Sequence, residues 1–232
     1  MTSKINSFVT NVAYFNTDQG DKILYPFSPP IFQTEVDENF TNTLLEEGRK
    51  LNIKEDDWNN KLAGNLIYGR SYKYKQDMTD KAEAYIKVYV ERFFNGLIQR
   101  FGVDSNVDTL LRKTDDREQN RQGKLKLDTI WVNFSKKHDF NPPHSHSGIL
   151  SFVIFLKVPK EIFKVQADSN SKQAGKIVFT FGDQISKIQG SEYPIAPYKN
   201  LMLIFPANLR HFVPPYWVDE ERISVSGNFI IV

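Results

Sequence analysis

Cysteine is absent from this 232-residue chain, and its absence limits both covalent and metal chemistry. Disulfide bonds cannot form, and thiolate ligands are excluded from any metal site. A bound metal ion must therefore be held by nitrogen and oxygen atoms. Histidine is also scarce, with 4 copies. Three of them, His144, His146 and His211, occur beside predicted strands.

The sequence also has little excess charge and no long apolar run. Its 30 basic and 28 acidic residues leave a formal net charge of +2, which does not favour a nucleic acid or a membrane as partner. Residues 1–6 lack the apolar segment of a signal peptide, and no apolar run has the length of a membrane span. We therefore expect a soluble cytoplasmic protein without nucleic-acid or membrane partners.

The composition is that of a globular protein. A hydrophobic content of 40% and a charged content of 25% argue against disorder. The 18 phenylalanines and 10 tyrosines suit β-strands and an aromatic-lined cavity. Because no linker is apparent, we expect one domain over residues 1–232. Residues 1–124 would supply strands and helices, and residues 125–232 a β core that carries the site.

Two helices are expected in the first half of the chain. Asp37 is a candidate cap for a helix over residues 38–51. Apolar residues at helical spacing predict a longer helix over residues 79–101, ended by Gly102. The polar segment 103–125 is predicted to be mainly a loop.

From about residue 125 the pattern changes to strands separated by long loops. Strands are predicted over residues 128–134, 148–158, 176–181, 201–205 and 222–232. This order suits a sandwich or barrel better than alternating strand–helix units, with the N-terminal helices packed against one sheet. The predicted fold class is α+β, mainly β.

The first of these strands has an apolar and a polar face. Ile130, Val132 and Phe134 alternate with Trp131 and Asn133, so the two sets point to opposite sides. Asn133 is either a candidate to point into a functional site or a residue that satisfies local backbone groups.

The last strand carries Arg222, Ser224, Ser226 and Asn228 on one face. It is either an exposed sheet edge or one wall of a wet cavity. No acidic residue shares this face, so a buried Arg222 would require an anion. A dicarboxylate would supply it through a bidentate contact, with the Ser224 hydroxyl as a second donor. The alternative is an exposed arginine paired with a glutamate at 220–221.

A metal site is predicted from the three histidines. His144 and His146 follow Pro142-Pro143 and, two residues apart in a strand, would project to the same side. His211 comes from a separate strand end, as the third ligand of a site built across the fold must. Imidazole binds iron, zinc, copper and nickel, so the ligand type alone does not identify the metal.

Several motifs in one order resemble a known enzyme family. They are Trp131-Val132-Asn133, Asn141-Pro142-Pro143-His144-Ser145-His146, Phe205-Pro206, His211 and Arg222-Ile223-Ser224. They are similar to motifs of the 2-oxoglutarate/Fe(II)-dependent oxygenases, in a group met in bacteria and marine phages. The resemblance runs from about Trp131 to Asn228. A phage-encoded member would act in the host cytoplasm.

The resemblance implies a double-stranded β-helix, or jelly roll, with the metal at its open end. It implies Fe(II) and 2-oxoglutarate as cofactors and O2 as cosubstrate. It further implies His144 as the first ligand, His211 as the distal ligand, Arg222 as the residue that binds the far carboxylate of 2-oxoglutarate, and Ser224 as its hydroxyl partner. Asn133 joins them as a candidate cofactor-binding residue, and no catalytic side chain is expected beyond the metal ligands.

The sequence departs from the family pattern at His146, where these enzymes carry Asp or Glu. Three arrangements are open: a three-histidine site, which we favour, a two-histidine site with water as third ligand, or a carboxylate from elsewhere such as Asp183. His138 is expected to be a surface histidine. Phe152 and Phe155 stand where the related pattern has small and tyrosyl residues, and we expect them to reshape the pocket.

The expected function is decarboxylation of 2-oxoglutarate coupled to hydroxylation of a second molecule. A prolyl or other peptidyl side chain and a small molecule both fit, and neither the substrate nor the oligomeric state follows from the sequence. Two other classes stay open. A cupin-type three-histidine metalloenzyme that does not use 2-oxoglutarate would have no need of Arg222 and Ser224. A non-enzymatic jelly-roll binding module would bind no stoichiometric metal.

Overall fold

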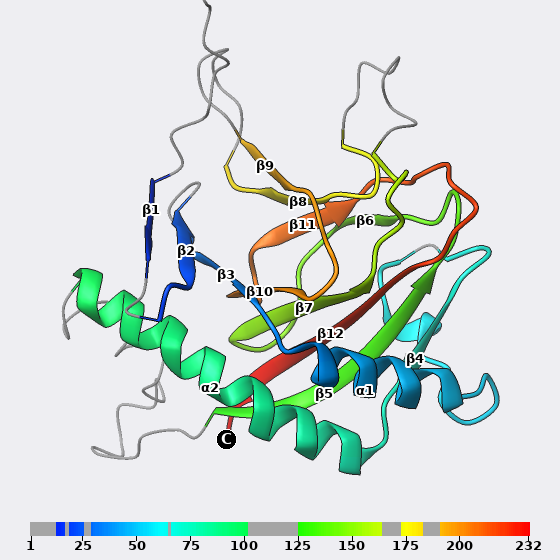
Figure 1. Cartoon of the computed structure of the whole chain (residues 1–232), viewed down its shortest axis with the longest axis horizontal. Helices are drawn as coiled ribbons and strands as arrows, with labels where there is room; N and C mark the ends of the chain where they lie inside the picture. Colours follow the sequence, from blue (N-terminus) through cyan, green and yellow to red (C-terminus); the bar gives the residue numbers. More distant parts are fainter. Residues whose placement is uncertain are drawn as a thin grey trace, which may run out of the picture.

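Two antiparallel sheets form the body of the protein and face one another (Figure 1). The computed structural model describes residues 13–16, 19–25, 29–64, 66–101, 125–163, 173–182 and 191–232. The larger, 8-stranded sheet has the strand order β1-β2-β3-β10-β7-β12-β5-β4, and the smaller, 4-stranded sheet has the order β6-β11-β8-β9.

The strands of the second half agree with the predicted ones to within a few residues. The larger sheet contains β1 (Ala13–Asn16), β2 (Lys22–Tyr25), β3 (Ile31–Glu35), β4 (Arg70–Lys73), β5 (Leu125–Ser135), β7 (Leu150–Lys157), β10 (Leu201–Pro206) and β12 (Arg222–Ile231). The smaller sheet contains β6 (Asn141–His144), β8 (Ile177–Thr180), β9 (Glu192–Ile195) and β11 (Arg210–Val213).

The eight strands from β5 to β12 have the connectivity of a jelly roll. The chain passes between the sheets, so that β5, β7, β10 and β12 lie in the larger sheet and β6, β8, β9 and β11 in the smaller. Within the larger sheet these strands are neighbours in the order β10-β7-β12-β5. This double-layered arrangement is the architecture of jelly-roll proteins, and the predicted fold class is confirmed.

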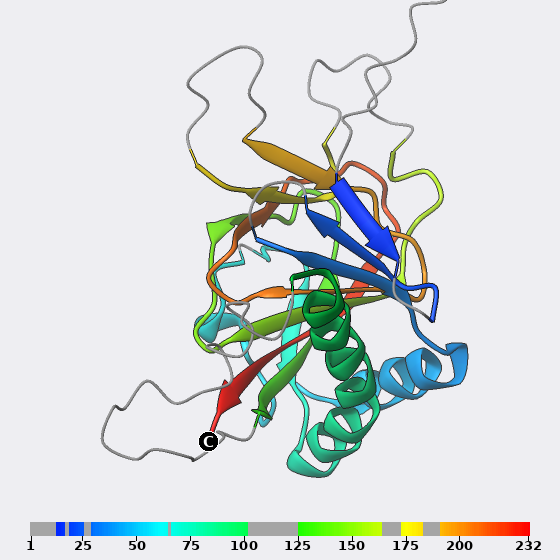
Figure 2. The same ribbon diagram turned by 90° about the vertical axis from the view of Figure 1, so that its left-hand side faces the viewer.

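Two helices cover the outer face of the larger sheet, on the side away from the smaller sheet (Figures 1 and 2). Helix α1 (Glu38–Lys50) begins as predicted, because the Asp37 carboxylate accepts hydrogen bonds from the backbone N–H groups of Asn39 and Phe40. Helix α2 (Gln76–Phe101) begins three residues before the predicted start at Thr79. A short 3-10 helix, η1 (Asn59–Lys61), lies between α1 and β4.

The larger sheet separates two hydrophobic cores. The first lies between this sheet and the helices and contains Leu44 of α1, Phe93 of α2, and Ile130, Val132 and Phe134 of β5. The second lies between the two sheets. Its members include Val153, Phe155, Leu203, Phe205 and Phe179. The predicted alternation in β5 is confirmed, because Trp131 and Asn133 line a cavity instead of joining the helix-side core.

Strand β12 lies in the interior of the larger sheet, between β7 and β5. It pairs with both neighbours, and Ser224 lies opposite Asn133 of β5 and Phe155 of β7. Of the two alternatives for this strand, the exposed sheet edge is excluded and the cavity wall is confirmed, because Arg222, Ser224 and Ser226 line the cavity. Arg222 and Ser224 are each 5% exposed.

Some sequence predictions lie outside the described residues. They concern the loop over residues 103–124, the helix end at Gly102 and the candidate ligand Asp183. Within the ranges that the structure describes, no helix combines the length and apolar character of a membrane span.

Candidate active site

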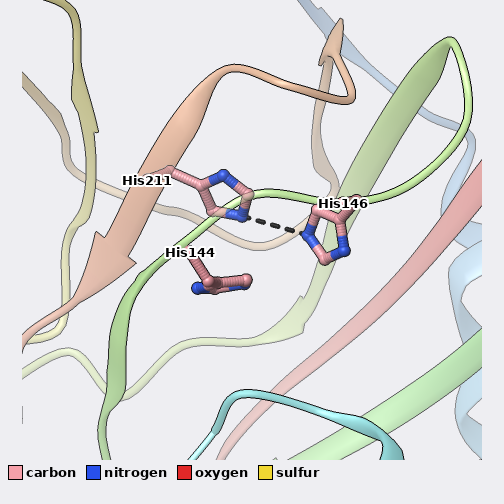
Figure 3. Close-up of side chains that lie close together, drawn as sticks. All are labelled: His144, His146 and His211. Atoms are coloured by element: carbon pink, nitrogen blue, oxygen red, sulfur yellow. Dashed lines mark hydrogen bonds between the residues drawn. The ribbon is translucent and has the colours of Figure 1, made fainter.

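Three histidine rings meet between the two sheets (Figure 3). His144 is the last residue of β6, His146 lies in the turn that follows, and His211 lies in β11. One nitrogen from each ring lies within 4.8 Å of one from each of the others. In the sheet, His211 is the direct partner of His144. The structure thus brings together the three predicted ligands, although 65 residues of sequence separate His146 from His211.

The reason predicted for the proximity of His144 and His146 is wrong in one respect. The two residues do not share a strand, because β6 ends at His144. The backbone N–H of His146 instead donates to the carbonyl of Ala207 (2.8 Å), and that of Ala207 donates to the carbonyl of Ile149 (3.0 Å). The turn after β6 is therefore joined to the turn before β11, which carries His211.

Backbone carbonyls fix the orientation of two of the rings. His144 Nδ1 lies 2.7 Å from the carbonyl of Pro142, and His211 Nδ1 lies 2.9 Å from that of Leu209. A carbonyl only accepts, so each Nδ1 carries the proton and each neutral ring presents the Nε2 lone pair. Such outer-shell bonds orient the histidine ligands of metal sites. His146 and His211 face each other with Nε2 atoms 3.2 Å apart.

Burial keeps all three rings neutral. It lowers the pKa of His144, lowers that of His146 to about 4 and lowers that of His211 to about 3. The neighbouring histidines add to the effect for His146 and His211, because a second positive charge in the cluster is unfavourable. Neutral imidazole is the form that binds a metal ion.

Arg222 is a buried cation that forms no salt bridge with any residue of described position. Within the described chain its Nε finds no hydrogen-bond partner, and its guanidinium carbon lies 5.3 Å from the centre of the Phe155 ring. Burial lowers its pKa to about 10, so it stays charged at neutral pH. The alternative pairing with the adjacent glutamates is wrong: Glu221 pairs with Arg49 (2.8 Å) and Glu220 lies 4.0 Å from Lys157.

Asn133 lies opposite Ser224 and is held by a residue that the sequence did not indicate. The hydroxyl of Ser71 in β4 donates to Asn133 Oδ1 (2.7 Å). Because the carbonyl end of the amide is engaged, its NH2 group remains available to the cavity. Both residues are buried, at 0% exposure for Ser71 and 9% for Asn133. Local sequence gives no signal for Ser71, which reaches Asn133 through the pairing of β4 with β5.

One cavity of about 130 Å³ contains all of these groups. It is lined by the three histidines, Asn133, Arg222 and Ser224, and by Asn59, Lys61, Leu62, Ala63, Gly64, Ser71, Trp131, Asn141, Ser145, Phe152, Val153, Ile177, Phe205, Val213 and Ser226. Every predicted site residue is therefore a member of one lining. The residues around η1 were not predicted, because they belong to no motif and reach the cavity through the fold.

The structure also places His138, Phe152 and Phe155, for which the sequence analysis made separate predictions. His138 is exposed, lies 6.4 Å from Trp217 by ring centres and is not part of the histidine cluster. Phe152 and Phe155 do shape the pocket region, since Phe152 lines the cavity and Phe155 lies beneath Arg222. Among the residues with described positions, the metal-type cluster contains no carboxylate.

The groups fit the chemistry of an iron site with an organic-acid cosubstrate. Fe(II) accepts imidazole nitrogen ligands, and a dicarboxylate would partner the buried guanidinium of Arg222, which forms no salt bridge within the described part of the chain. Residues 129–228 match a family described as "Putative 2OG-Fe(II) oxygenase". No curated protein matches the sequence of this chain.

Solved structures with a similar fold cover most of the chain. The structure of OsALKBH1 has a TM-score of 0.52 at 10% identity, covering 87% of this chain and 97% of the other. The viral collagen prolyl hydroxylase vCPH from Paramecium Bursaria Chlorella virus-1, in complex with 2-oxoglutarate, has a TM-score of 0.50 at 11% identity, covering 86% and 94%. The non-heme alpha ketoglutarate dependent epimerase SnoN from nogalamycin biosynthesis has a TM-score of 0.50 at 14% identity, covering 86% and 78%.

The resemblance drawn from the sequence motifs is confirmed by the family match. Residues 129–228, which contain the three histidines and Arg222, carry the sequence pattern of this family, and the match supports a 2-oxoglutarate-dependent Fe(II) oxygenase with Fe(II) and 2-oxoglutarate as its cofactors. The structural likenesses, all at low identity, establish the shared fold. The two other classes left open by the sequence, a metalloenzyme without 2-oxoglutarate and a binding module, are not supported.

Proposed function

We propose that this oxygenase is a hydroxylase whose iron is held by His144, His146 and His211, and whose 2-oxoglutarate is held by Arg222, Ser224 and Asn133. The observation that carries the proposal is a single cavity with three neutral imidazoles at one place and, at another, a buried guanidinium whose Nε has no hydrogen-bond partner among the described residues. When bound, Fe(II) and 2-oxoglutarate supply O2 activation coupled to decarboxylation, which yields succinate and CO2.

The three histidines would hold the metal with one ring nitrogen each. Their Nε2 atoms converge because the backbone carbonyls of Pro142 and Leu209 hold the Nδ1–H groups of His144 and His211. His146 takes the place of the usual carboxylate of a facial triad, so the protein contributes no negative charge to the metal. Three protein ligands would leave further coordination positions for 2-oxoglutarate and O2.

Arg222 and its neighbours orient the cosubstrate. Its guanidinium offers a rigid fork of donors for the far carboxylate, and the Ser224 hydroxyl adds a donor from the same face of β12. The NH2 group of Asn133, fixed by Ser71, adds a third donor opposite Ser224. The Phe155 ring packs against the guanidinium of Arg222 but cannot accept a bidentate pair of hydrogen bonds. The N–H donors of the guanidinium therefore remain available to the far carboxylate of 2-oxoglutarate.

The apolar side chains of the lining limit the access of water to the reacting groups. Phe152, Val153 and Phe205 form part of the cavity wall and are each at most 6% exposed. Exclusion of water strengthens the electrostatic contacts to the cosubstrate and protects reactive species from side reactions.

The proposed substrate is a C–H group of a peptide, with a prolyl side chain as the first to test, or of a small molecule. The similar fold of the viral collagen prolyl hydroxylase supports beginning with prolyl peptides. The mixed polar and apolar lining around His146, with Trp131 and Ser226, is compatible with either class.

An anaerobic titration tests the assignment of the site. Metal-free protein is titrated with Fe(II) and then 2-oxoglutarate, and the visible charge-transfer band of the iron–oxoacid chelate is recorded for wild type, Arg222→Ala and the surface control Arg49→Ala. We expect the band in all three, with an affinity for 2-oxoglutarate about tenfold to a hundredfold weaker in Arg222→Ala alone. Equal affinities in the three proteins would remove Arg222 from the site. Iron binding without any band would contradict the proposal as a whole.

A further inference from the structure

The segment between α1 and β4 forms one wall of the cavity and joins the edges of both sheets. This wall segment, residues 56–64, includes η1 and is drawn in cyan beside β4 in Figure 1. Five of its residues, Asn59, Lys61, Leu62, Ala63 and Gly64, line the cavity that contains the histidines. No sequence motif marks this segment.

One end of the wall segment is fixed to β4, the edge strand of the larger sheet. Trp58 donates its backbone N–H to the carbonyl of Ser71 (3.0 Å), and Lys73 donates its own to the carbonyl of Asp56 (2.9 Å). Asn59 Oδ1 accepts the backbone N–H of Ser71 (3.0 Å). These bonds keep η1 in place and remove much of the freedom that a surface connection would otherwise have.

The other end of the wall segment packs against β6, the edge strand of the smaller sheet. A β-carbon on Gly64 would overlap the side-chain oxygen of Asn141, so the wall segment and β6 approach each other closely at this point. Asn141 begins the strand that ends at His144. The wall segment therefore closes the side of the sandwich next to the proposed metal ligands.

Lys61 is the cation that the wall segment presents to this cavity. Its side chain lines the cavity but is exposed, so it lies at the mouth, whereas Arg222 is buried within. Lys61 forms no ion pair with any residue whose position is described. Among the described lining residues there are these two cations and no aspartate or glutamate.

With Fe(II) and 2-oxoglutarate bound, the site would contain no negative charge left over to pair with Lys61. The positive charges of Fe(II) and the negative charges of 2-oxoglutarate cancel, and the three proposed ligands are neutral. In the usual facial triad a carboxylate ligand would offset the positive charge of either Lys61 or Arg222. This chain has the neutral His146 at that position. The cavity thus keeps a net positive charge when loaded, which favours an anion at its mouth.

We propose that Lys61 is a specificity-determining residue and that the substrate carries a carboxylate bound by its ammonium group. This rests on the proposed function, and it narrows the substrate class to acids, either a small organic acid or a peptide with an acidic or terminal carboxylate near the oxidised carbon. The rigid wall segment sets the distance between that carboxylate and the metal. Neutral analogues of the same shape bind more weakly, because they leave the charge of Lys61 unmatched.

Calorimetry with matched probes tests this assignment without turnover. The Fe(II) enzyme, saturated with 2-oxoglutarate under anaerobic conditions, is titrated with N-acetyl derivatives of proline, leucine and tyrosine and with the corresponding primary amides. The proteins are wild type, Lys61→Met, Lys61→Arg and Lys54→Met. Lys54 is a matched control, because it is an exposed lysine of the same α1–β4 connection but does not line the cavity.

We expect acids to bind wild type about tenfold more tightly than their amides. The preference should persist in Lys61→Arg and Lys54→Met and disappear in Lys61→Met. A preference that survives in Lys61→Met, or wild-type binding that does not distinguish acid from amide, overturns the inference. Failure of every acid to bind at millimolar concentration does so as well. Longer peptides that carry the same terminal acid then separate peptide substrates from small acids.

The iron–oxoacid band distinguishes failure of this inference from failure of the proposed function. It is recorded before and after each titration, and an unchanged band shows that an acid probe has not displaced 2-oxoglutarate. A normal band with no acid preference overturns the role of Lys61 alone. Absence of the band in wild type overturns the proposed function and this inference together.

Discussion

Ser71 and Asn133 form a buried hydrogen bond of 2.7 Å across 62 residues of sequence. They lie opposite each other in neighbouring strands β4 and β5. The bond determines which end of the Asn133 amide faces the cavity, since the serine hydroxyl donates to the amide oxygen. The fold thus uses an edge strand to orient a side chain that we propose to contact 2-oxoglutarate.

Removal of the Ser71 hydroxyl should weaken 2-oxoglutarate binding without affecting the metal. In Ser71→Ala the Asn133 amide is no longer held in one orientation. We expect the affinity for 2-oxoglutarate to fall about twofold to tenfold, which corresponds to the net free energy of one hydrogen bond. Anaerobic titration of the chelate band gives the cosubstrate affinity, and iron affinity is measured separately. Unchanged 2-oxoglutarate affinity would mean that Asn133 serves only the packing between β4 and β5.

Substitution of His146 distinguishes the three arrangements of the metal site. If His146 is a ligand, His146→Ala should weaken iron binding by at least the roughly tenfold to hundredfold that loss of an outer-shell partner costs. His146→Asp should retain iron and the chelate band, because a carboxylate restores the usual facial triad. Iron affinity in His146→Ala equal to wild type would instead indicate water, or a carboxylate such as Asp183, in the third position.

Metal and cosubstrate should raise the unfolding temperature. At ligand concentrations about 100 times the dissociation constant, binding to the folded state contributes about 3 kcal/mol, which corresponds to several degrees for a chain of this size. A thermal scan with Fe(II) and 2-oxoglutarate under anaerobic conditions measures the shift, and a chelator should reverse it. His211→Ala should lose the response. A full shift in that variant would place the metal elsewhere.

Gly227 is a packing requirement of β12. A β-carbon there would lie 2.6 and 2.7 Å from two atoms of the Phe152 ring and 2.8 Å from the carbonyl oxygen of Thr129. We expect Gly227→Ala to lower the free energy of unfolding by about 1–3 kcal/mol, as overpacking of a core does. Denaturant unfolding with Val88→Ala, at an exposed position of α2, as the control measures this. Equal midpoints for the two variants would show that Phe152 can move aside.

Much of the fold could be predicted from the sequence because its strands have clear patterns. The alternation over residues 128–134 gave the correct faces of β5, with Trp131 and Asn133 toward the cavity. The polar face of the last strand was recognised, but its place between two neighbours was not, because strand order depends on pairings with β5 and β7. Local periodicity contains no information about such partners.

The site was predictable where motifs exist and not elsewhere. His144, His146, His211 and Arg222 were identified from residue type and order, and the structure brings them into one cavity. The two-residue spacing was attributed to a shared strand, whereas the strand ends at His144 and a backbone bond to Ala207 holds His146. Lys61 and Ser71 gave no signal, because their roles follow only from the docking of the wall segment and β4.

The backbone bonds between Ala207 and the segment from His146 to Ile149 have a consequence for how the enzyme handles its iron. They join the segment that carries His146 to the turn just before β11, the strand of His211, so these backbone bonds help to set the spacing of the two rings. We therefore expect the proposed metal site to be largely preorganised, so that uptake and loss of the ion would not require the chain to refold.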